Sequence, residues 1–258
     1  MKMSRYIKIL SLAFLLAFIT SCTKDADYAI DQTGYEPCLK WQVGYLDGYK
    51  NLSANIGSDG LTIDAVLLGK NNLGSEVQYL IQPLDEEGKL AQLKGDFFVQ
   101  LDYENFTSSP GGGTFEMVIG GHTGTNLTYN GIYSGSIGSS SSDSTEGLGI
   151  YNNTNGYTPI NTYTNSDKFL PLPGKLTSGS ISIQRAGEEL IIVVKTDYNE
   201  LRDTQPVKDD MLDFYFQLGT SADENVSSSI IFKKFTVVGG GEAIRSDFFD
   251  CYSIRLNK

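Results

Sequence analysis

Apolar and polar residues alternate with a period of two along several segments of this 258-residue chain, and this alternation constrains its fold more than any other feature. Along residues 96–104 the odd-numbered positions are apolar or aromatic, whereas the even-numbered ones are mostly polar. Along residues 211–218 every second residue from Leu212 to Leu218 is apolar. Successive side chains of a β-strand point to opposite faces of the sheet. Both segments therefore predict half-buried strands.

A short glycine-containing turn at 186–188 separates two β-rich runs, 180–185 and 189–195, and this pattern predicts a β-hairpin. The second run is apolar on both faces, so we expect it to lie centrally in its sheet. Residues 229–238 mix apolar and polar residues on both faces, which indicates a β-bulge. Further strands are expected at 61–68, 76–84, 115–120 and 248–256.

The composition agrees with a chain of many strands and turns. Glycine accounts for 28 residues, about 11% of the chain against roughly 7% in typical proteins, and charged residues make up only 20%. No stretch with helical periodicity exceeds two turns. The chain is therefore predicted to be all-β, a two-sheet antiparallel β-sandwich rather than a parallel α/β fold, with residues 37–258 as a single domain.

The first 22 residues have the pattern of an export leader. Three basic residues precede the stretch Ile9–Ile19, in which only Ser11 is polar. Such a stretch has the length of a signal-peptide core and is shorter than the roughly 20 residues that a membrane-spanning helix needs. It ends in residues 19–22 (ITSC), which resemble the lipobox of bacterial lipoproteins, in which the cysteine becomes the acylated first residue of the mature chain.

This resemblance implies a signal peptide at 1–21, an acylated tether at 22–36 and a lipid, such as palmitate, on Cys22. An ordinary secretory leader is the alternative. The polar residues 23–27 are similar to the export signals of Bacteroidetes-type lipoproteins, which implies anchoring in the outer membrane at the cell surface, with a periplasm-facing anchor as the alternative. The mature chain carries a net charge of −14, so its acyl chains rather than its surface would hold it at an anionic membrane.

Two cysteines remain once Cys22 is assigned to lipid. Cys38 and Cys251 lie near the two ends of the mature chain, in a compartment where disulfides persist. A disulfide between them would close a very long loop. By reducing the entropy of the unfolded chain, it would stabilise the folded state by roughly 5 kcal/mol. Two buried free thiols are an equally weighted alternative.

The residue inventory excludes several classes of partner and cofactor. One histidine and three cysteines cannot form a zinc finger or a multi-histidine metal centre. His122 lies among glycines and is expected in a turn rather than in a catalytic triad. A chain with a pI near 4.5 lacks the basic surface that nucleic acids require. No cofactor is predicted, although the acidic and Asn-rich loops are compatible with a structural calcium ion.

Several of these segments together resemble the concanavalin A-like lectin/glucanase jelly roll. The resemblance rests on residues 95–102 (GDFFVQLD), 179–190 (GSISIQRAGEEL), 216–220 (FQLGT) and 231–237 (IFKKFTV), and it would cover about Trp41–Leu256. It implies a jelly-roll sandwich. It does not choose among lectins, laminin G-type modules and glycosidases, because the shared residues are structural.

Catalytic carboxylates are harder to place. Glycosidases of this superfamily often carry an E-x-D-x-x-E strand motif, which is absent here, and this absence weighs against hydrolysis. Asp102 or Glu104 on one strand would face Asp213 on another if those strands were neighbours. The alternative is that these residues belong to solvated sheet faces, as antiparallel sheets require.

The segment from Tyr129 to Tyr163 combines tyrosines with asparagine, glycine and serine, and is interpreted as a glycan-binding loop region. Tyrosine rings stack on sugars, and amide side chains both donate to and accept from hydroxyl groups. The alternative is that the tyrosines pack on the edge of the sandwich while Asn and Gly form turns. The predicted ligand contacts are Tyr133, Tyr151, Asn153, Tyr157 and Tyr163, together with Asp102 and Asp213.

Carbohydrate binding by a lipid-anchored surface protein is the function that these features favour. A glycoside hydrolase or lyase with a non-standard carboxylate or tyrosine site is the first alternative. An anchored structural or adhesive module that recognises protein, including partners in the envelope, is the second.

Overall fold

The computed structural model describes most of the chain from Lys40 onward. The described residues are 40–45, 52–57, 59–69, 77–84, 91–108, 112–122, 129–139, 145–153, 168–220, 222–241, 244 and 253–256. Within these ranges the protein is all-β, so it contains no helix that could cross a membrane.

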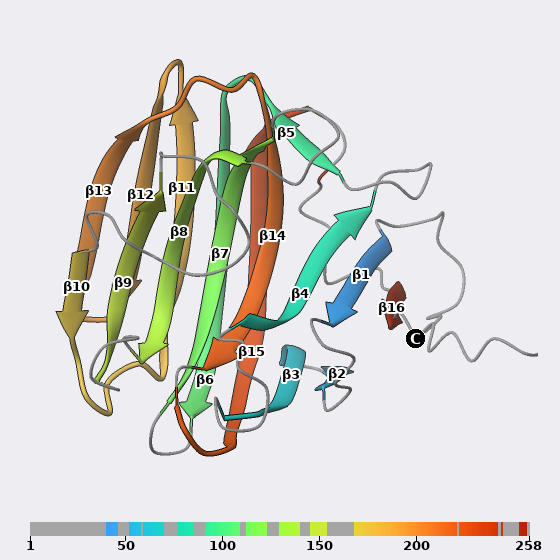
Figure 1. Ribbon diagram of the computed structural model, residues 1–258, viewed down its shortest axis with the longest axis vertical. Coiled ribbons are helices and arrows are strands. Elements are labelled where there is room, and N and C mark those ends of the chain that lie inside the picture. The colour runs from blue at the N-terminus through green and yellow to red at the C-terminus, as the bar shows by residue number, and fades with distance from the viewer. Residues whose placement is uncertain are drawn as a thin grey trace, which may run out of the picture.

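Nine of the described strands form the larger sheet, which lies toward the viewer in Figure 1. In spatial order they are β10 (Lys168–Pro171), β9 (Glu146–Asn153), β8 (Tyr129–Ser139), β7 (Gly113–His122), β14 (Met211–Thr220), β4 (Val77–Leu84), β1 (Lys40–Tyr45) and β16 (Ser253–Leu256), with β5 (Gln92–Lys94) also paired to β14. All of these pairs are antiparallel except β1 and β16, which run parallel.

Seven described strands form the second sheet, which packs behind the first (Figure 1). Their order is β13 (Glu200–Pro206), β12 (Glu189–Thr196), β11 (Ser178–Ala186), β6 (Phe97–Ser108), β15 (Val226–Gly239), β3 (Gly60–Leu67) and β2 (Leu52–Gly57). Every pair in this sheet is antiparallel. The predicted two-sheet sandwich is therefore confirmed.

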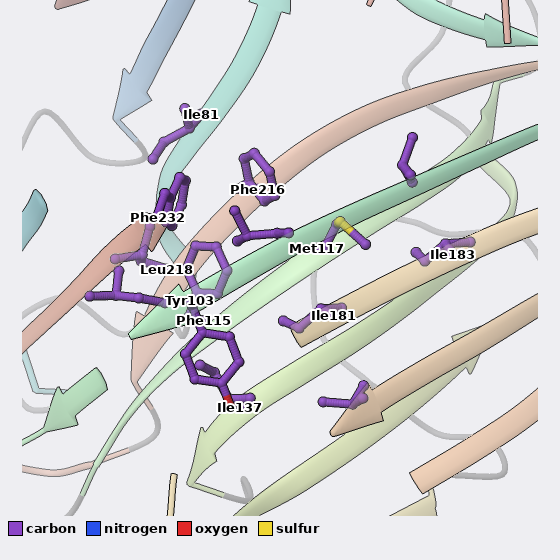
Figure 2. Packing of buried hydrophobic residues seen from close by; sticks show 14 of the residues in the cluster. Ile81, Tyr103, Phe115, Met117, Ile137, Ile181, Ile183, Phe216, Leu218 and Phe232 are labelled. Carbon is purple, nitrogen blue, oxygen red and sulfur yellow. The ribbon is translucent and has the colours of Figure 1, made fainter. Parts of the chain in front are cut away.

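The core fills the space between the two sheets. Figure 2 shows aromatic and aliphatic side chains of both sheets pointing toward one another. Phe216 of β14 lies at the centre of an aromatic cluster and contacts Phe232 of the other sheet, with ring centroids 5.2 Å apart. Burial of such large apolar rings contributes strongly to the stability of a sandwich of this kind.

Several predicted strands are confirmed close to their expected limits. The hairpin is formed by β11 and β12, and Gly187 in its turn has a φ of +62°, which glycine adopts at no steric cost. The bulge expected at 229–238 is present, because the register of β15 against β6 shifts twice. The strand at 189–195, expected to be central, is an interior strand one place from the edge, and its second face is only partly buried.

β14 differs from its prediction in one respect. The sequence predicts a half-buried strand with a solvated polar face, but every residue from Leu212 to Thr220 is buried. The strand lies in the middle of the larger sheet, between β7 on one side and β4 and β5 on the other. Its polar residues are therefore enclosed among other side chains instead of facing open solvent.

The segment from Tyr129 to Tyr163 was expected to be a loop region, and this expectation is wrong for much of it. β8 and β9 occupy 129–139 and 146–153 and pair with each other in the larger sheet. Glycine at position 135 replaces a larger residue because the opposite sheet approaches closely there. A Cβ added at Gly135 would lie 2.8 Å from methyl groups of Ile181 and Val194.

An ion pair links the two sheets at one open edge of the sandwich. Lys168 Nζ of β10 lies 2.6 Å from Asp203 Oδ1 of β13. Burial alone would raise the pKa of Asp203, but hydrogen bonds from Lys168, Gln205 and the Thr204 backbone outweigh it and lower that pKa below its ordinary value. The pair thus holds the edge strands of the two sheets together.

Candidate functional site

The polar residues of β7, β8, β9 and β14 lie together on one surface. This surface, here called the outer face, is the side of the larger sheet turned away from the smaller sheet. Strand alternation places it opposite the core residues Phe115, Ile137 and Phe216. The described side chains of its centre are Tyr151, Ser134, Ser136, Glu116, Val118, Asp213, Tyr215 and Gln217.

Strand register arranges these side chains in rows across the sheet. In one row Tyr151 of β9 is opposite Ser134 of β8, which is opposite Val118 of β7, which is opposite Tyr215 of β14. The next row runs through Gly149, Ser136, Glu116 and Gln217. Residues directly opposite in antiparallel strands have Cβ atoms about 4.5–5.5 Å apart, so side chains within a row are in contact distance.

A hydrogen-bonded carboxylate lies at the centre of the outer face. Ser134 Oγ donates to Glu116 Oε2 at 3.0 Å, and Gln217 Nε2 donates to the same oxygen at 2.9 Å. Glu116 is 8% exposed, Gln217 6% and Ser134 1%. These contacts fix the orientation of the Glu116 carboxyl group in surroundings from which most water is excluded, where each hydrogen bond is stronger than in water.

A second carboxylate lies two rows away. Gln92 Nε2 of β5 donates to Asp213 Oδ1 at 2.7 Å, and Asp213 is also buried. The positions around this centre, including Tyr151, Ile132 and Gln92, are partly exposed. The polar centre is therefore more buried than Tyr151, Ile132 and Gln92 at its rim.

Tyr151 lies against the outer face at this rim. A Cβ added at Gly149 would lie 2.8 Å from both Cε2 and the hydroxyl oxygen of Tyr151 and 2.4 Å from Ser136 Oγ. The absence of a side chain at position 149 thus leaves the space that the ring occupies. The ring lies over Gly149 on the same face as Glu116, two strands away from it, and an aromatic ring at such a place suits stacking on a ligand.

Tyr133 occupies a different position from the one expected. Its ring faces the core and is 4% exposed, and its hydroxyl donates to the Pro206 carbonyl at 2.8 Å. Burial, together with the charge of Asp209, raises the pKa of this hydroxyl. A ring in this position holds the two sheets together and cannot stack on a ligand, so the predicted ligand contact at Tyr133 does not fit the structure.

The other predicted residues separate into two groups. Asn153 belongs to β9 and pairs with Ile132, next to the Tyr151 row, although its side chain lies outside the described part of the chain. Five further residues lie outside the described part of the chain as well: Tyr157, Tyr163, Cys22, Cys38 and Cys251. The predictions made for them stay predictions.

Asp102 and Asp213 are not neighbours. Asp102 lies on β6 of the smaller sheet, whose partners are β11 and β15, whereas Asp213 lies on β14 of the larger sheet. Each points outward from its own sheet, so the core separates them. Glu104, the other candidate on β6, forms an exposed ion pair with Lys233 at 3.4 Å. β6 and β14 are not neighbours, so the facing carboxylate pair that depended on that condition is not formed.

Glu116 and Asp213 are the carboxylates that the structure does bring to the outer face. Glu116 is opposite Gln217, and Asp213 is four residues from Gln217 on the same strand, which corresponds to about 13 Å along the strand. Retaining glycosidases need about 5 Å between their carboxyl groups and inverting ones roughly 6.5–9.5 Å. The separation of about 13 Å refers to backbone positions, and on the outer face Glu116 and Asp213 are two hydrogen-bonding points.

A shallow groove of about 670 Å³ lies on the opposite side of the sandwich, over β2, β3 and β15. Ser229 Oγ donates there to Asp64 Oδ1 at 2.6 Å, and Ser53 and Thr107 complete the same row. No aromatic side chain lines this groove. It therefore lacks the apolar surface for stacking that Tyr151 gives to the outer face.

The sequence pattern does not indicate three of the site residues, Glu116, Ser134 and Gln217. Glu116 and Gln217 are 101 positions apart, and nothing local marks either as functional. The one signal that could have indicated Glu116 and Gln217 is that each is a polar residue on a strand otherwise buried on both faces. Among the described residues, no group of three or more His, Cys, Asp or Glu side chains is placed to hold a metal ion.

Comparisons with known proteins agree on the fold. No family model matches this chain. No curated protein matches it either. Among solved structures, the alginate lyase A1-II′, a member of polysaccharide lyase family 7, is 11% identical over 76% of this chain and 86% of its own, with a TM-score of 0.50.

Two further structures of the same architecture are similar. A legume lectin-like domain from Entamoeba histolytica is 11% identical over 78% of this chain and 91% of its own, with a TM-score of 0.49. A glycoside hydrolase family 16 endo-glucanase from Bacteroides ovatus is 12% identical over 74% and 93%, with a TM-score of 0.43. Similarity at so low a sequence identity concerns the fold alone. The protein has the concanavalin A-like jelly-roll fold, which its sequence resembles.

Proposed function

We propose that this protein is a lipid-anchored surface protein that binds carbohydrate through the outer face of its larger sheet. The observation that carries the proposal is the buried, hydrogen-bonded group of Glu116, Ser134 and Gln217 on the sheet face that also carries the partly exposed Tyr151. A sugar presents hydroxyl groups at its edges and C–H groups on its faces. Oriented carboxylate and amide groups suit the former, and a tyrosine ring suits the latter.

The shared fold supports this proposal only indirectly. The alginate lyase belongs to a polysaccharide lyase family, yet jelly rolls host unrelated functions. The arrangement of residues on the outer face is what favours carbohydrate here.

Calorimetry of the lipid-free domain against plant, microbial and mucin glycans tests carbohydrate binding directly. We expect Tyr151→Ala to weaken binding of any glycan found by about tenfold or more, since stacking on an aromatic ring is lost. Tyr198→Ala is the matched control, because Tyr198 is 92% exposed and lies between β12 and β13, away from the outer face. Equal weakening by both variants, or none by Tyr151→Ala, would place the site elsewhere.

The lipid anchor rests on the leader and on Cys22. Replacement of Cys22 by alanine is expected to move the protein from the membrane fraction to the soluble fraction and to abolish labelling by an alkyne analogue of palmitate. Ser21→Ala keeps a small residue before the cysteine and is expected to leave both unchanged. Protease treatment of intact cells distinguishes a surface location from a periplasm-facing one. Retention of the Cys22→Ala protein in the membrane would contradict lipid anchoring.

A further inference from the structure

The smaller sheet also has an open surface, on the side turned away from the larger sheet. This surface, here called the back face, is formed by alternate residues of β13, β12, β11, β6 and β15. Every described strand belongs to one of the two sheets, so no described strand covers the back face. Its side chains therefore meet either solvent or a partner.

A row of charged residues that alternate in sign crosses the back face. Strand register places Glu200 of β13 opposite Lys195 of β12, which is opposite Ser180 of β11. Ser180 is opposite Asp102 of β6, which is opposite Lys234 of β15. The row is thus negative, positive, neutral, negative and positive. Each charge has its opposite at the same distance on the other side of β11.

The four charged side chains of this row are accessible. Lys195, Glu200 and Lys234 are exposed, whereas Asp102 is half-buried and accepts a hydrogen bond from the neutral amide of Gln100 at 2.6 Å. Within the described part of the chain, none of the four forms an ion pair. A partner can therefore engage these charges without breaking an existing pair.

Apolar side chains lie beside the charged row. Phe98 of β6 is opposite Val238 of β15, and Val238 is 62% exposed. Ile191 and Val193 of β12 are partly exposed on the same face. Alternating charges suit a solvated sheet, but apolar residues that adjoin them in this way are typical of the surfaces through which proteins bind one another.

We infer that the back face binds a second copy of this chain. A twofold axis that runs along β11, in the plane of the contact, carries each position to the other side of β11. Lys195 then faces the partner's Asp102, and Glu200 faces the partner's Lys234, so every charge of the row meets its opposite. The two outer faces point away from each other in this dimer. The inference goes beyond glycan binding and does not depend on it.

Other acidic residues limit the extent of the contact. In the next row Glu104 is already paired with Lys233 at 3.4 Å, and Asp197 accepts a hydrogen bond from Ser178 at 3.1 Å. Glu189 lies at the far end of β12, where rows of the two copies shift past each other because packed twisted sheets cross at about 30°.

The size of the contact indicates its strength. The rows through Ser180, Ser182 and Gln184 on five strands cover about 500 Å² in projection. A standard interface buries roughly 800 Å² per partner. We therefore expect a weak dimer, with a dissociation constant between about 10 and 100 μM.

Analytical ultracentrifugation from about 1 to 500 μM tests this dimer. The protein carries Cys22→Ala and reductant is present, so that neither acyl chains nor disulfides link two copies. Lys195→Glu and Asp102→Lys are each expected to weaken association by about tenfold or more, because each brings two like-charged pairs together across the axis. Lys94→Glu makes the same change of charge at an exposed position of the larger sheet and is expected to have no effect.

A mixture of the two reversed variants makes the test specific to the twofold arrangement. The introduced glutamate of one copy faces the introduced lysine of the other, and the unchanged Asp102 faces the partner's unchanged Lys195. We expect the mixture to form heterodimers of nearly the original affinity. Both changes in one chain are also expected to restore the dimer, although they place like charges side by side within each row.

Three outcomes would overturn the inference. A protein that stays monomeric at about 500 μM has no such interface. A dimer that both reversals leave intact uses another surface, and failure of the two folded variants to associate when mixed excludes the proposed axis. Circular dichroism of each variant confirms folding. Self-association is measured without glycan, so its failure leaves carbohydrate binding intact, and absence of glycan binding leaves the dimer intact.

Discussion

Replacement of Phe216 by alanine is expected to lower the free energy of unfolding by about 3–5 kcal/mol. The Phe216 ring is fully buried and contacts Phe232 and Phe235 of the smaller sheet, with centroid distances of 5.2 and 5.9 Å. It also contacts Phe115 and Phe214 of its own sheet at 5.6 and 5.2 Å. Alanine would leave a cavity between the sheets at the point where four rings meet, and these rings cannot collapse into it without losing contacts of their own.

Equilibrium denaturation in urea measures this change. Met211→Ala on the same strand is the control, because Met211 is 49% exposed, and we expect a change below about 0.5 kcal/mol there. A loss below about 1 kcal/mol for Phe216→Ala would mean that the aromatic cluster does not join the two sheets as described.

Replacement of Glu116 by methionine is expected to cost about 2–4 kcal/mol and to abolish glycan binding. The methionine fills much of the same volume but accepts no strong hydrogen bond. Ser134 and Gln217 would then keep buried donors without their carboxylate acceptor, and each buried unsatisfied donor costs about 1–3 kcal/mol.

Two companion variants make this prediction specific. Glu116→Gln retains an acceptor oxygen, so we expect a smaller loss of stability than for methionine. The triple change Glu116→Met/Ser134→Ala/Gln217→Met removes the orphaned donors as well and is expected to recover part of the stability, though not the binding. Stability of the triple variant no higher than that of Glu116→Met would show that the network does not hold these three strands together.

The sequence predicted those elements whose pattern is local. Period-two alternation identified β6 and β14, and the turn around Gly187 identified the hairpin of β11 and β12. Such signals depend only on the pleat of a strand and on the backbone freedom of glycine, both of which act over a few residues.

β8 and β9 were missed because their strand character does not come from apolar residues. Gly135 faces the core where the smaller sheet approaches closely, and Gly149 faces Tyr151 on the other side. Small residues suit these positions because of what packs against them. A segment rich in glycine, serine and asparagine therefore resembled a loop when it was considered alone.

The candidate site required strand order and register. The sequence marks Asp213 as a candidate that would face Asp102 or Glu104 only if their strands were neighbours, and both of these residues lie across the core on the other sheet. Glu116 and Gln217 carry no local signal. They are brought together only because β7 and β14 are neighbours with Glu116 opposite Gln217.

The sequence by itself determined that the chain forms a sandwich of antiparallel strands, and it supports the expectation of an exported, lipid-anchored protein. These properties follow from composition, side-chain period and a short leader, which act locally along the chain. Only the tertiary structure decided which polar residues share a surface and which of them are withdrawn from solvent. Strand pairing joins residues far apart in the sequence, and a shift of β7 or β14 by one residue would turn Glu116 or Gln217 toward the core.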